Sequence, residues 1–351
     1  MALPDQLDAI VTGAITRRVF PGAVVLIAQA GATLHHAAYG TLVYDSGAVP
    51  VAHDTIYDIA SLTKMFTATA ALRLIDAGQL DLHMPAARYL PELRAHTVTI
   101  WHLLTHTSGL EIRLSALRHA GSAQLWARVF ALAPARPPGT SVAYTNVNSL
   151  LLGEIVARLV GTPLDRALAQ LVIEPLGLAS TQFCPPEHLH ARIAPTERDE
   201  EWRGGLVHGS VHDESAHMLG GVAGHAGLFS SAADLAQFGR MWLSAITGAA
   251  PGAPLLSPRL ARLAASNQTP ALSLGCGLGW MIDRPNFMGA APAGTLGHTG
   301  FTGPAIIVSP ARQRLVVVLS NRVYPRRSEP AHHQITAAIV AAALAAQASE
   351  Q

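Results

Sequence analysis

The only lysine in the chain, Lys64, lies three residues after Ser61, in the segment YDIASLTKMFT. The chain has 24 Lys and Arg residues, and all the others are arginines. Arginine keeps its proton at any ordinary pH, whereas a desolvated lysine can lose it. On a helix, residues three apart share one face, with Cβ atoms about 5–6 Å from each other. The pair therefore predicts a serine nucleophile beside an amine that takes its proton. The alternative is a capping serine and a surface lysine.

The segment 208–225 is the second group of candidate residues. It contains clustered imidazoles and carboxylates: His208, His212, Asp213, Glu214, His217 and His225. Such a cluster raises the hypothesis of a metal site. The interleaved glycines favour a loop over a pocket instead, and no HExxH or cysteine ligand set is present. We therefore expect neither a metal nor an organic cofactor, and the sequence assigns these histidines no role.

The composition excludes several classes of function. Of the 351 residues, 50% are hydrophobic and 13% are charged, and the formal net charge is +1. These values indicate a globular chain without a basic stripe for nucleic acid. Residues 1–20 do not resemble a signal peptide, and the longest apolar run, 335–346, is shorter than a bilayer span. We expect a cytoplasmic protein with a small-molecule substrate and no membrane or nucleic-acid partner, although an export segment could lie outside this sequence. The oligomeric state stays open.

Hydrophobic spacing predicts the elements that position the serine. Apolar residues at three- and four-residue steps predict helices over 4–19, 62–77, 122–132, 149–160, 163–172, 234–244 and 333–346. Short runs rich in Val and Ile predict a hairpin over 23–39 and strands over 278–282, 294–299, 304–309 and 315–320. Strands therefore lie near both ends of the chain, and helices fill the middle.

This order of elements predicts an α+β fold in a single domain, 1–351. Residues 1–60 and 270–351 are expected to form an antiparallel sheet flanked by the terminal helices, and residues 61–269 a mostly helical lobe. Ser61 falls at the junction of the two, and clefts at such junctions are where sites usually lie.

Two further polar groups follow Ser61 in chain order. Tyr144-Thr145-Asn146 comes out of a proline-rich break and precedes the helix predicted over 149–160. We expect Tyr144 and Asn146 on a loop, from which polar side chains can face a cleft. His298-Thr299-Gly300 comes at the end of the strand predicted over 294–299.

Ser61-x-x-Lys64, Tyr144-x-Asn146 and His298-Thr299-Gly300, in this order, resemble the three motifs of the serine β-lactamase and penicillin-binding-protein superfamily. The resemblance is to its class C β-lactamases, DD-peptidases and esterases. It covers nearly the whole chain and includes the flanking segments HTSGL at 106–110 and EPLGL at 174–178. The stretch 211–228 is similar to a branch described as penicillin-binding-protein-4B-like or β-lactamase-related. The resemblance implies the β-lactamase/transpeptidase-like fold.

The resemblance also implies a role for each motif residue. Ser61 would attack an acyl carbonyl, and Lys64 would take its proton or hold Tyr144 as a phenolate. Tyr144 would relay a proton to the leaving group. Asn146 would orient Lys64 and bind the substrate amide.

The third motif would form the opposite wall of the site. His298, Thr299 and Gly300 would line the pocket from an edge strand, along which an extended substrate could lie. The backbone N–H groups of Ser61 and Phe301 would form the oxyanion hole.

The third motif departs from the family pattern, in which a lysine usually takes the position of His298. A histidine weakens the permanent positive charge for a substrate carboxylate and predicts binding that depends on pH near neutrality. Efficient β-lactamase activity is therefore in question. The chain has no Ser-Asp-Asn motif of class A enzymes and no Gly-x-Ser-x-Gly nucleophile elbow.

We therefore predict a serine hydrolase that acts through an acyl-Ser61 intermediate on small esters or D-amino-acid amides and peptides. One alternative is a penicillin-binding sensor or slow β-lactamase that acylates and then deacylates poorly. The other is a metal-dependent hydrolase that uses the histidines of 208–225.

Overall fold

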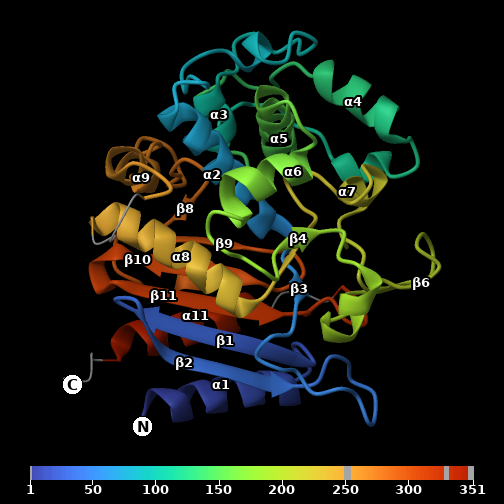
Figure 1. Cartoon of the computed structure of the whole chain (residues 1–351), viewed down its shortest axis with the longest axis vertical. Coiled ribbons are helices and arrows are strands. Elements are labelled where there is room, and N and C mark those ends of the chain that lie inside the picture. Colours follow the sequence, from blue (N-terminus) through green and yellow to red (C-terminus); the bar gives the residue numbers. More distant parts are fainter. Residues whose placement is uncertain (1, 249–253, 328–331, 347–351) are drawn as a thin grey trace.

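The structure is a computed structural model that describes residues 2–248, 254–327 and 332–346. Its central feature is a six-stranded antiparallel sheet made from both ends of the chain (Figure 1). The strand order is β2-β1-β11-β10-β9-β8. The bounds are β1 Gly22–Gln29, β2 Ala32–Gly40, β8 Met281–Ile282, β9 Leu296–Thr299, β10 Ala305–Ser309 and β11 Arg314–Ser320. The predicted α+β fold is confirmed.

The first and last strands pair in the middle of the sheet, where Val25 of β1 lies opposite Val318 of β11. Both strands are buried along nearly their whole length. A strand that is covered on both faces has a continuous apolar sequence instead of alternating apolar and polar residues. Residues 316–319 show this pattern. The strand predicted over 278–282 is shorter than expected, because a tight turn at 277–280 occupies its first half and only β8 remains extended.

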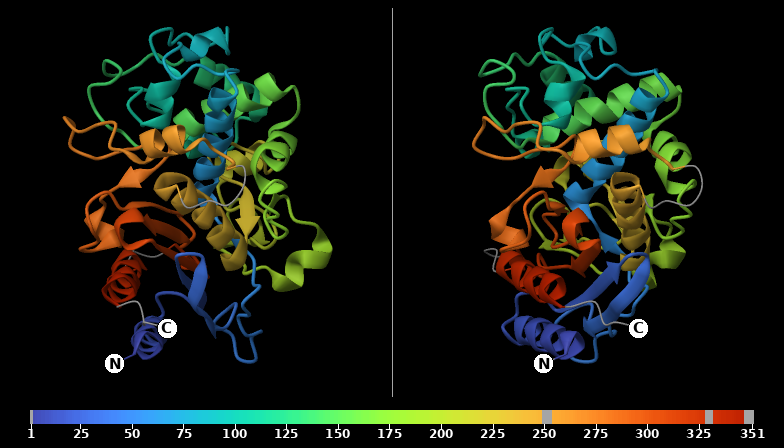
Figure 2. Two further views of the ribbon diagram at one scale, coloured as in Figure 1. Left: turned by 60° about the vertical axis from the view of Figure 1, so that its left-hand side comes forward. Right: turned by 90° about the vertical axis from the view of Figure 1, so that its left-hand side faces the viewer.

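Helices cover both faces of the sheet (Figure 2). The terminal helices α1 (Leu3–Thr16) and α11 (His332–Ala345) pack on one face, and α8 (Ala232–Thr247) packs on the other. The approach of α8 is close, since a Cβ on Gly239 would lie 2.4 Å from Leu315 Cδ1. The sequence placed this helix in the lobe 61–269, but it packs on the sheet because its buried face matches the second face of the strands.

The remaining helices form the second half of the molecule around α2 (Thr63–Asp76), which is buried on nearly all sides. The others are α3 Ile100–Leu104, α4 Ser122–Phe130, α5 Asn146–Val160, α6 Leu164–Leu168, α7 Glu214–Met218 and α9 Pro258–Ala265. The short helix α10 (Pro285–Met288) packs instead against α11 on the first face of the sheet. Among the described residues, no single helix is long and apolar enough to cross a bilayer. The pair Asn146–Val160 and Leu164–Ile173 passes by length and composition only when taken together, and it bends by 80°.

Three very short strands join the two halves, and the sequence predicted none of them. They are β3 Tyr57–Asp58, β7 Leu228–Ser230 and β4 Gln182–Phe183, in the order β3-β7-β4. A separate hairpin pairs β5 (Arg198–Asp199) with β6 (Gly205–Leu206). Because β3 directly precedes Ser61, its pairing with β7 brings the histidine-rich segment beside the serine.

Candidate active site

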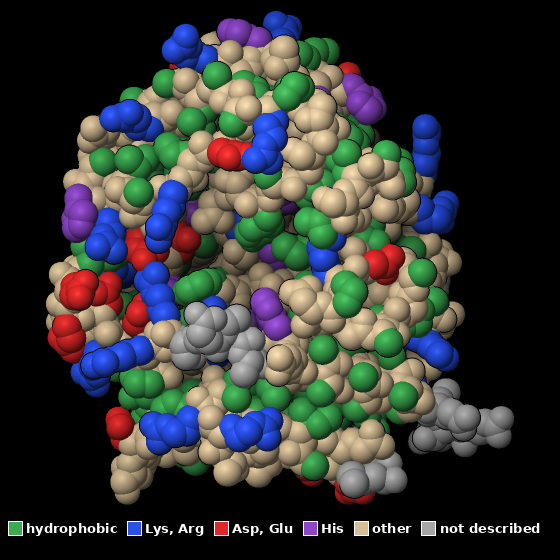
Figure 3. All heavy atoms as spheres, turned by 180° about the vertical axis from the view of Figure 1, so that it is seen from behind, with side chains coloured by type: hydrophobic (Ala, Val, Ile, Leu, Met, Phe, Trp, Pro, Cys, Tyr) green, Lys and Arg blue, Asp and Glu red, His purple; other side chains and the backbone are tan. Residues whose placement is uncertain are grey.

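The sequence-predicted residues meet in one pocket of about 940 Å³ between the helical half and the sheet. The pocket opens on the face shown in Figure 3, where the surface is hollowed between these halves. Seven predicted residues line it: Ser61, Tyr144, Asn146, His298, Thr299, Gly300 and Phe301. The eighth, Lys64, lies behind Ser61 and is only 2% exposed.

Ser61 lies in a single turn of 3-10 helix, Ala60–Leu62, that runs into α2. Lys64, in the first turn of α2, donates from Nζ to Ser61 Oγ at 2.8 Å. The same nitrogen donates to the carbonyl oxygen of His225 at 3.0 Å. The expected pairing of serine and amine on one helix face is therefore present. A backbone carbonyl therefore helps to orient the amine. The role that the resemblance gives to Asn146 in orienting Lys64 stays a prediction.

Burial lowers the pKa of the Lys64 ammonium to about 7, and the negative charge of Asp213 opposes the shift. A lysine in water titrates near 10.4, so this amine is neutral in a large share of molecules at neutral pH. A neutral amine at 2.8 Å from a hydroxyl can take its proton.

Asp213 is the nearby carboxylate, and it caps α7 by accepting the N–H of Ala216. Its Oδ1 also lies 2.6 Å from Ser215 Oγ and 3.2 Å from His225 Nε2. Burial alone would raise the pKa of Asp213, but the charge of His225 and these hydrogen bonds hold it far below its usual range. Asp213 therefore stays ionised beside the buried amine.

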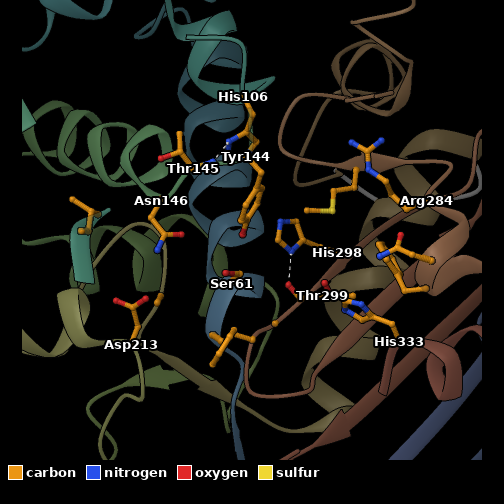
Figure 4. Close-up of a pocket in the computed structure, with 18 of the residues that line it drawn as sticks. Ser61, His106, Tyr144, Thr145, Asn146, Asp213, Arg284, His298, Thr299 and His333 are labelled. Carbon is orange, nitrogen blue, oxygen red and sulfur yellow. Dashed lines mark hydrogen bonds between the residues drawn. The ribbon is translucent and has the colours of Figure 1, made fainter. Parts of the chain in front are cut away.

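Tyr144 stands between two imidazoles over the serine (Figure 4). Its ring centroid lies 4.9 Å from that of His106 and 5.8 Å from that of His298, and Lys64 Nζ is 5.0 Å from it. Tyr144 is 45% exposed as a whole residue. Desolvation of its phenol group raises the pKa of Tyr144 above its usual range, and a hydrogen bond with Ser61 opposes the shift. The raised pKa keeps the Tyr144 hydroxyl protonated, and the hydrogen bond keeps it next to the serine.

His298 differs from the expectation. It is 2% exposed, and its Nδ1 lies 2.9 Å from the carbonyl oxygen of Thr299. Burial and the charge of Lys64 lower the pKa of His298 to about 3. The predicted titration near neutrality is therefore wrong, because the sequence does not reveal how deeply this imidazole is buried, and His298 is neutral at pH 7.

Asn146 and Phe301 both line the pocket, and they come from different parts of the fold. Asn146 is the first residue of α5, which begins earlier than predicted, because Thr145 caps the helix by accepting the N–H of Val147. Asn146 therefore lies in a helical turn and not on a loop. Phe301 follows Gly300 beyond the end of β9, with its ring 48% exposed.

The histidines of 208–225 do not form a metal centre, since the described residues contain no group of three or more potential ligands that could hold a metal ion. His208 contacts the carbonyl oxygens of His190 and Ile193. His212 Nε2 lies 2.8 Å from Glu197. These side chains hold the loop together, and the segment contributes backbone groups and Asp213 to the site.

Three residues around the pocket were missed at the sequence level. Asp58 is buried and His106 is half-buried beside the motif residues, and neither lies at a sequence spacing that indicates a chemical role. Arg284 lines the pocket opposite Asp213 (Figure 4). Among the described residues it has no carboxylate partner, and one of its guanidinium nitrogens lies 3.5 Å from Cys276 Sγ. An isolated arginine in a loop has no sequence signature.

A buried lysine and a tyrosine that converge on one serine, between a helical half and an antiparallel sheet, define a serine hydrolase of the acyl-enzyme type. The sequence model of the Beta-lactamase family matches residues 7–341. The chain belongs to this family, and the recognition made from the three motifs is confirmed.

Known relatives agree with this assignment. The protein named "Putative D-alanyl-D-alanine carboxypeptidase" of Escherichia coli O157:H7 is 29% identical over 353 residues, which cover 89% of this chain and 80% of that protein. The hydrolase EstCE1, described as having promiscuous acyltransferase activity, has a TM-score of 0.78 at 22% identity and covers 97% of this chain and 98% of its own. A class C β-lactamase of Rhodobacter sphaeroides has a TM-score of 0.75 at 22% identity, covering 97% and 100%. At these identities the two structures establish the fold.

Proposed function

We propose that the protein is a serine carboxypeptidase or esterase that cleaves small D-amino-acid amides and esters through an acyl-Ser61 intermediate. The observation that carries the proposal is the contact of 2.8 Å between Ser61 Oγ and Lys64 Nζ, an amine whose pKa burial lowers to about 7. This contact supports Lys64 as a base of suitable strength for the Ser61 hydroxyl.

In the proposed acylation step, neutral Lys64 takes the proton of Ser61 while Oγ bonds to the carbonyl carbon. The N–H groups of Ser61 and Phe301 hold the resulting oxyanion. The bond to the leaving group then breaks, and Tyr144 gives its proton to the departing atom and regains one from protonated Lys64. The raised pKa of the Tyr144 phenol favours this order over a phenolate base. Water then attacks the acyl-enzyme and releases the acid.

The charges in the pocket support a substrate with a carboxylate. Arg284 faces the cavity, and its charge helps to lower the pKa of His106 and of His298. The pocket carboxylates Asp213 and Glu214 contact His225 and Arg327, respectively. Arg284 is therefore available to an anionic group of the substrate, as in a peptide that ends in a free D-amino acid. The relative named as a carboxypeptidase supports the same substrate class.

Intact-protein mass tests the nucleophile. Wild type is incubated with p-nitrophenyl acetate, a penicillin or an acyl-D-Ala-D-Ala peptide, beside Ser61→Ala and the pocket-serine control Ser115→Ala. We expect acyl adducts or turnover in wild type and Ser115→Ala, and neither in Ser61→Ala. A stable penicillin adduct without peptide or ester turnover would favour the penicillin-binding sensor, and activity retained in Ser61→Ala would overturn the proposal.

The substrate carboxylate is tested with a matched pair, acetyl-D-alanyl-D-lactate and its methyl ester. Hydrogen bonds to charged groups contribute about 1.5–3 kcal/mol. We therefore expect Arg284→Met to lower kcat/KM for the free acid about 10–100-fold and to leave the methyl ester within about threefold. Equal losses for both substrates would remove Arg284 from carboxylate recognition.

A further inference from the structure

Asp58 is a buried carboxylate three residues before the nucleophile, and it is 1% exposed. Its Oδ1 accepts the N–H of Ala60 at 2.8 Å, and its Oδ2 accepts the N–H of His212 at 2.7 Å. Among the described residues it forms no salt bridge to a lysine or arginine. A buried carboxylate without a cationic partner is costly in free energy. Burial accordingly raises the pKa of Asp58. Such a group calls for an explanation beyond packing.

The first hydrogen bond holds a strained residue next to the serine. Ala60 has φ +45°, a left-handed conformation that is strained for a residue with a Cβ atom. This conformation turns the chain from β3 into the single 3-10 turn that contains Ser61. The backbone N–H of Ser61 is thus oriented by a turn that the Asp58 carboxylate holds in place.

Asp58 also anchors the opposite wall of the site. Its carbonyl oxygen accepts the hydroxyl of Thr302 at 2.7 Å. Gly300 packs against the same turn, since a Cβ there would lie 2.7 Å from the carbonyl oxygen of Ile59. Phe301, between Gly300 and Thr302, is therefore fixed from both sides.

The second hydrogen bond of the Asp58 carboxylate connects it indirectly, through His212, to the Phe301 turn. Asp58 holds the backbone N–H of His212, and the imidazole of His212 stacks on the Phe301 ring, with centroids 5.6 Å apart and planes 25° apart. Asp58 therefore links three segments that are distant in sequence: the Ser61 turn, the Phe301 turn and the loop at His212.

We propose that Asp58 is a positioning residue that sets the spacing between the two oxyanion-hole donors, the N–H groups of Ser61 and Phe301. The proposal rests on the acyl-enzyme function above. Its consequence is specific. Loss of the Asp58 anchors weakens binding of the tetrahedral transition state and leaves binding of the planar substrate nearly unchanged.

The test compares Asp58→Asn with variants of Thr302, whose hydroxyl donates to the Asp58 carbonyl oxygen. Asp58→Asn puts an amide donor opposite one of the two backbone N–H donors, of Ala60 or His212. Thr302→Val removes the hydroxyl, and Thr302→Ser keeps it. Asp234→Asn is the matched control, because Asp234 likewise accepts the N–H of Ser180 and the hydroxyl of Thr181 but does not line the pocket.

The readouts are kcat and KM for p-nitrophenyl acetate, the dissociation constant of phenylboronic acid, which forms a tetrahedral adduct on the serine, and Tm. Removal of one oxyanion-hole donor costs about 10²–10³ in kcat. We expect Asp58→Asn to lose about 10²-fold in kcat and in boronate affinity, with KM within about threefold. Thr302→Val should lose about tenfold, and Thr302→Ser should restore wild-type values. Asp234→Asn should change Tm only.

A folded Asp58→Asn with wild-type boronate affinity, or one in which KM changes and kcat does not, would overturn the proposal. If Asp58→Asn does not fold, Thr302→Val decides the matter, and unchanged boronate affinity there overturns it. If wild type turns over no ester or peptide, the proposed function fails, and the boronate comparison still tests Asp58 separately.

Discussion

Lys64 Nζ donates to the carbonyl oxygen of His225 at 3.0 Å, a contact between residues 161 positions apart. The carbonyl belongs to a glycine-rich segment that lies directly against α5, since a Cβ on Gly224 would be 2.1 Å from the carbonyl oxygen of Ser149. The preceding carbonyl, of Gly224, accepts the hydroxyl of Thr67 on α2. The lysine is therefore placed by backbone, and the histidine-rich segment contributes to the site through its main chain.

Activity should rise with pH through neutrality. Burial lowers the pKa of the Lys64 ammonium to about 7, and only the neutral amine can take the proton of Ser61. The acylation rate with p-nitrophenyl acetate, measured from pH 5 to 9, should follow one acid limb with a midpoint near 7. Lys64→Arg should be inactive across this range, because a guanidinium does not lose its proton.

The two pocket histidines, His106 and His298, are the other groups to which this rise of the rate with pH could be assigned. The pKa values of His106 and His298 are lowered to about 3, mainly by burial, so neither titrates between pH 5 and 9. His298→Gln should therefore keep an acid limb. Loss of the limb in His298→Gln with Lys64 intact would contradict the assignment of the base.

Gly224→Ala should displace the acceptor of Lys64. The added Cβ would overlap the carbonyl oxygen of Ser149, and overpacking of this kind costs about 1–3 kcal/mol. We expect a lower Tm and at least a tenfold loss of kcat, because the carbonyl of His225 moves with its neighbour. Gly13→Ala, where only the tip of Arg17 lies nearby at 3.3 Å, is the control and should retain activity. Full activity in a folded Gly224→Ala would show that the carbonyl does not position the amine.

The sheet and its terminal helices could be predicted because their signals are local. Runs such as Val316 to Leu319 and the helical spacing over 4–19 show which residues of the segment are buried, although the helix α1 ends at Thr16. The strands β3, β7 and β4 could not be predicted, since they are only two or three residues long. They form only by pairing with segments distant in the sequence, for example where Asp58 pairs with Phe229.

The contacts of the site are also of two kinds, those that follow from local sequence and those that depend on the fold. Ser61 and Lys64 lie one helical turn apart, so their contact follows from spacing alone. Asp58 and His212 lie 154 positions apart, and their hydrogen bond uses a backbone N–H that every residue except proline carries. The protonation of His298 was predicted incorrectly because it depends on burial by segments that the local sequence does not identify.

Glu197 should stabilise the fold at neutral pH and lose this effect in acid. Burial would raise its pKa, but hydrogen bonds and charge from His212 and Arg327 lower it to about 2. A carboxylate whose folded pKa lies below the unfolded value stabilises above the unfolded pKa, and the effect is lost as pH falls from about 4.5 to about 2. Allowing for solvent screening, we expect about 1–2 kcal/mol.

Thermal unfolding of Glu197→Gln measures this contribution. The variant should have a lower Tm than wild type at pH 6, and the difference should shrink toward pH 3. Glu200→Gln is the control, because Glu200 is 66% exposed and lies 3.7 Å from Arg198, and it should match wild type at both pH values. A constant difference between Glu197→Gln and wild type from pH 6 to 3 would contradict the assignment.

His298→Lys should change both the base and the substrate preference. His298 lines the pocket, and the charge of Lys64 already lowers the pKa of its imidazole. A cationic side chain at this position should therefore lower the pKa of Lys64 in return, since like charges disfavour each other. We expect the acid limb to move about one unit below that of wild type.

The same substitution should favour anionic substrates, because it adds a permanent charge to the pocket wall. The acylation rate with a penicillin should rise about tenfold relative to that with neutral p-nitrophenyl acetate, measured by stopped-flow for both compounds. His298→Gln, which keeps a neutral polar side chain, is the matched control and should leave this ratio near the wild-type value. If His298→Lys moves neither the limb nor the ratio, position 298 is electrostatically isolated from both Lys64 and the substrate, and the neutral imidazole has no part in setting the substrate class.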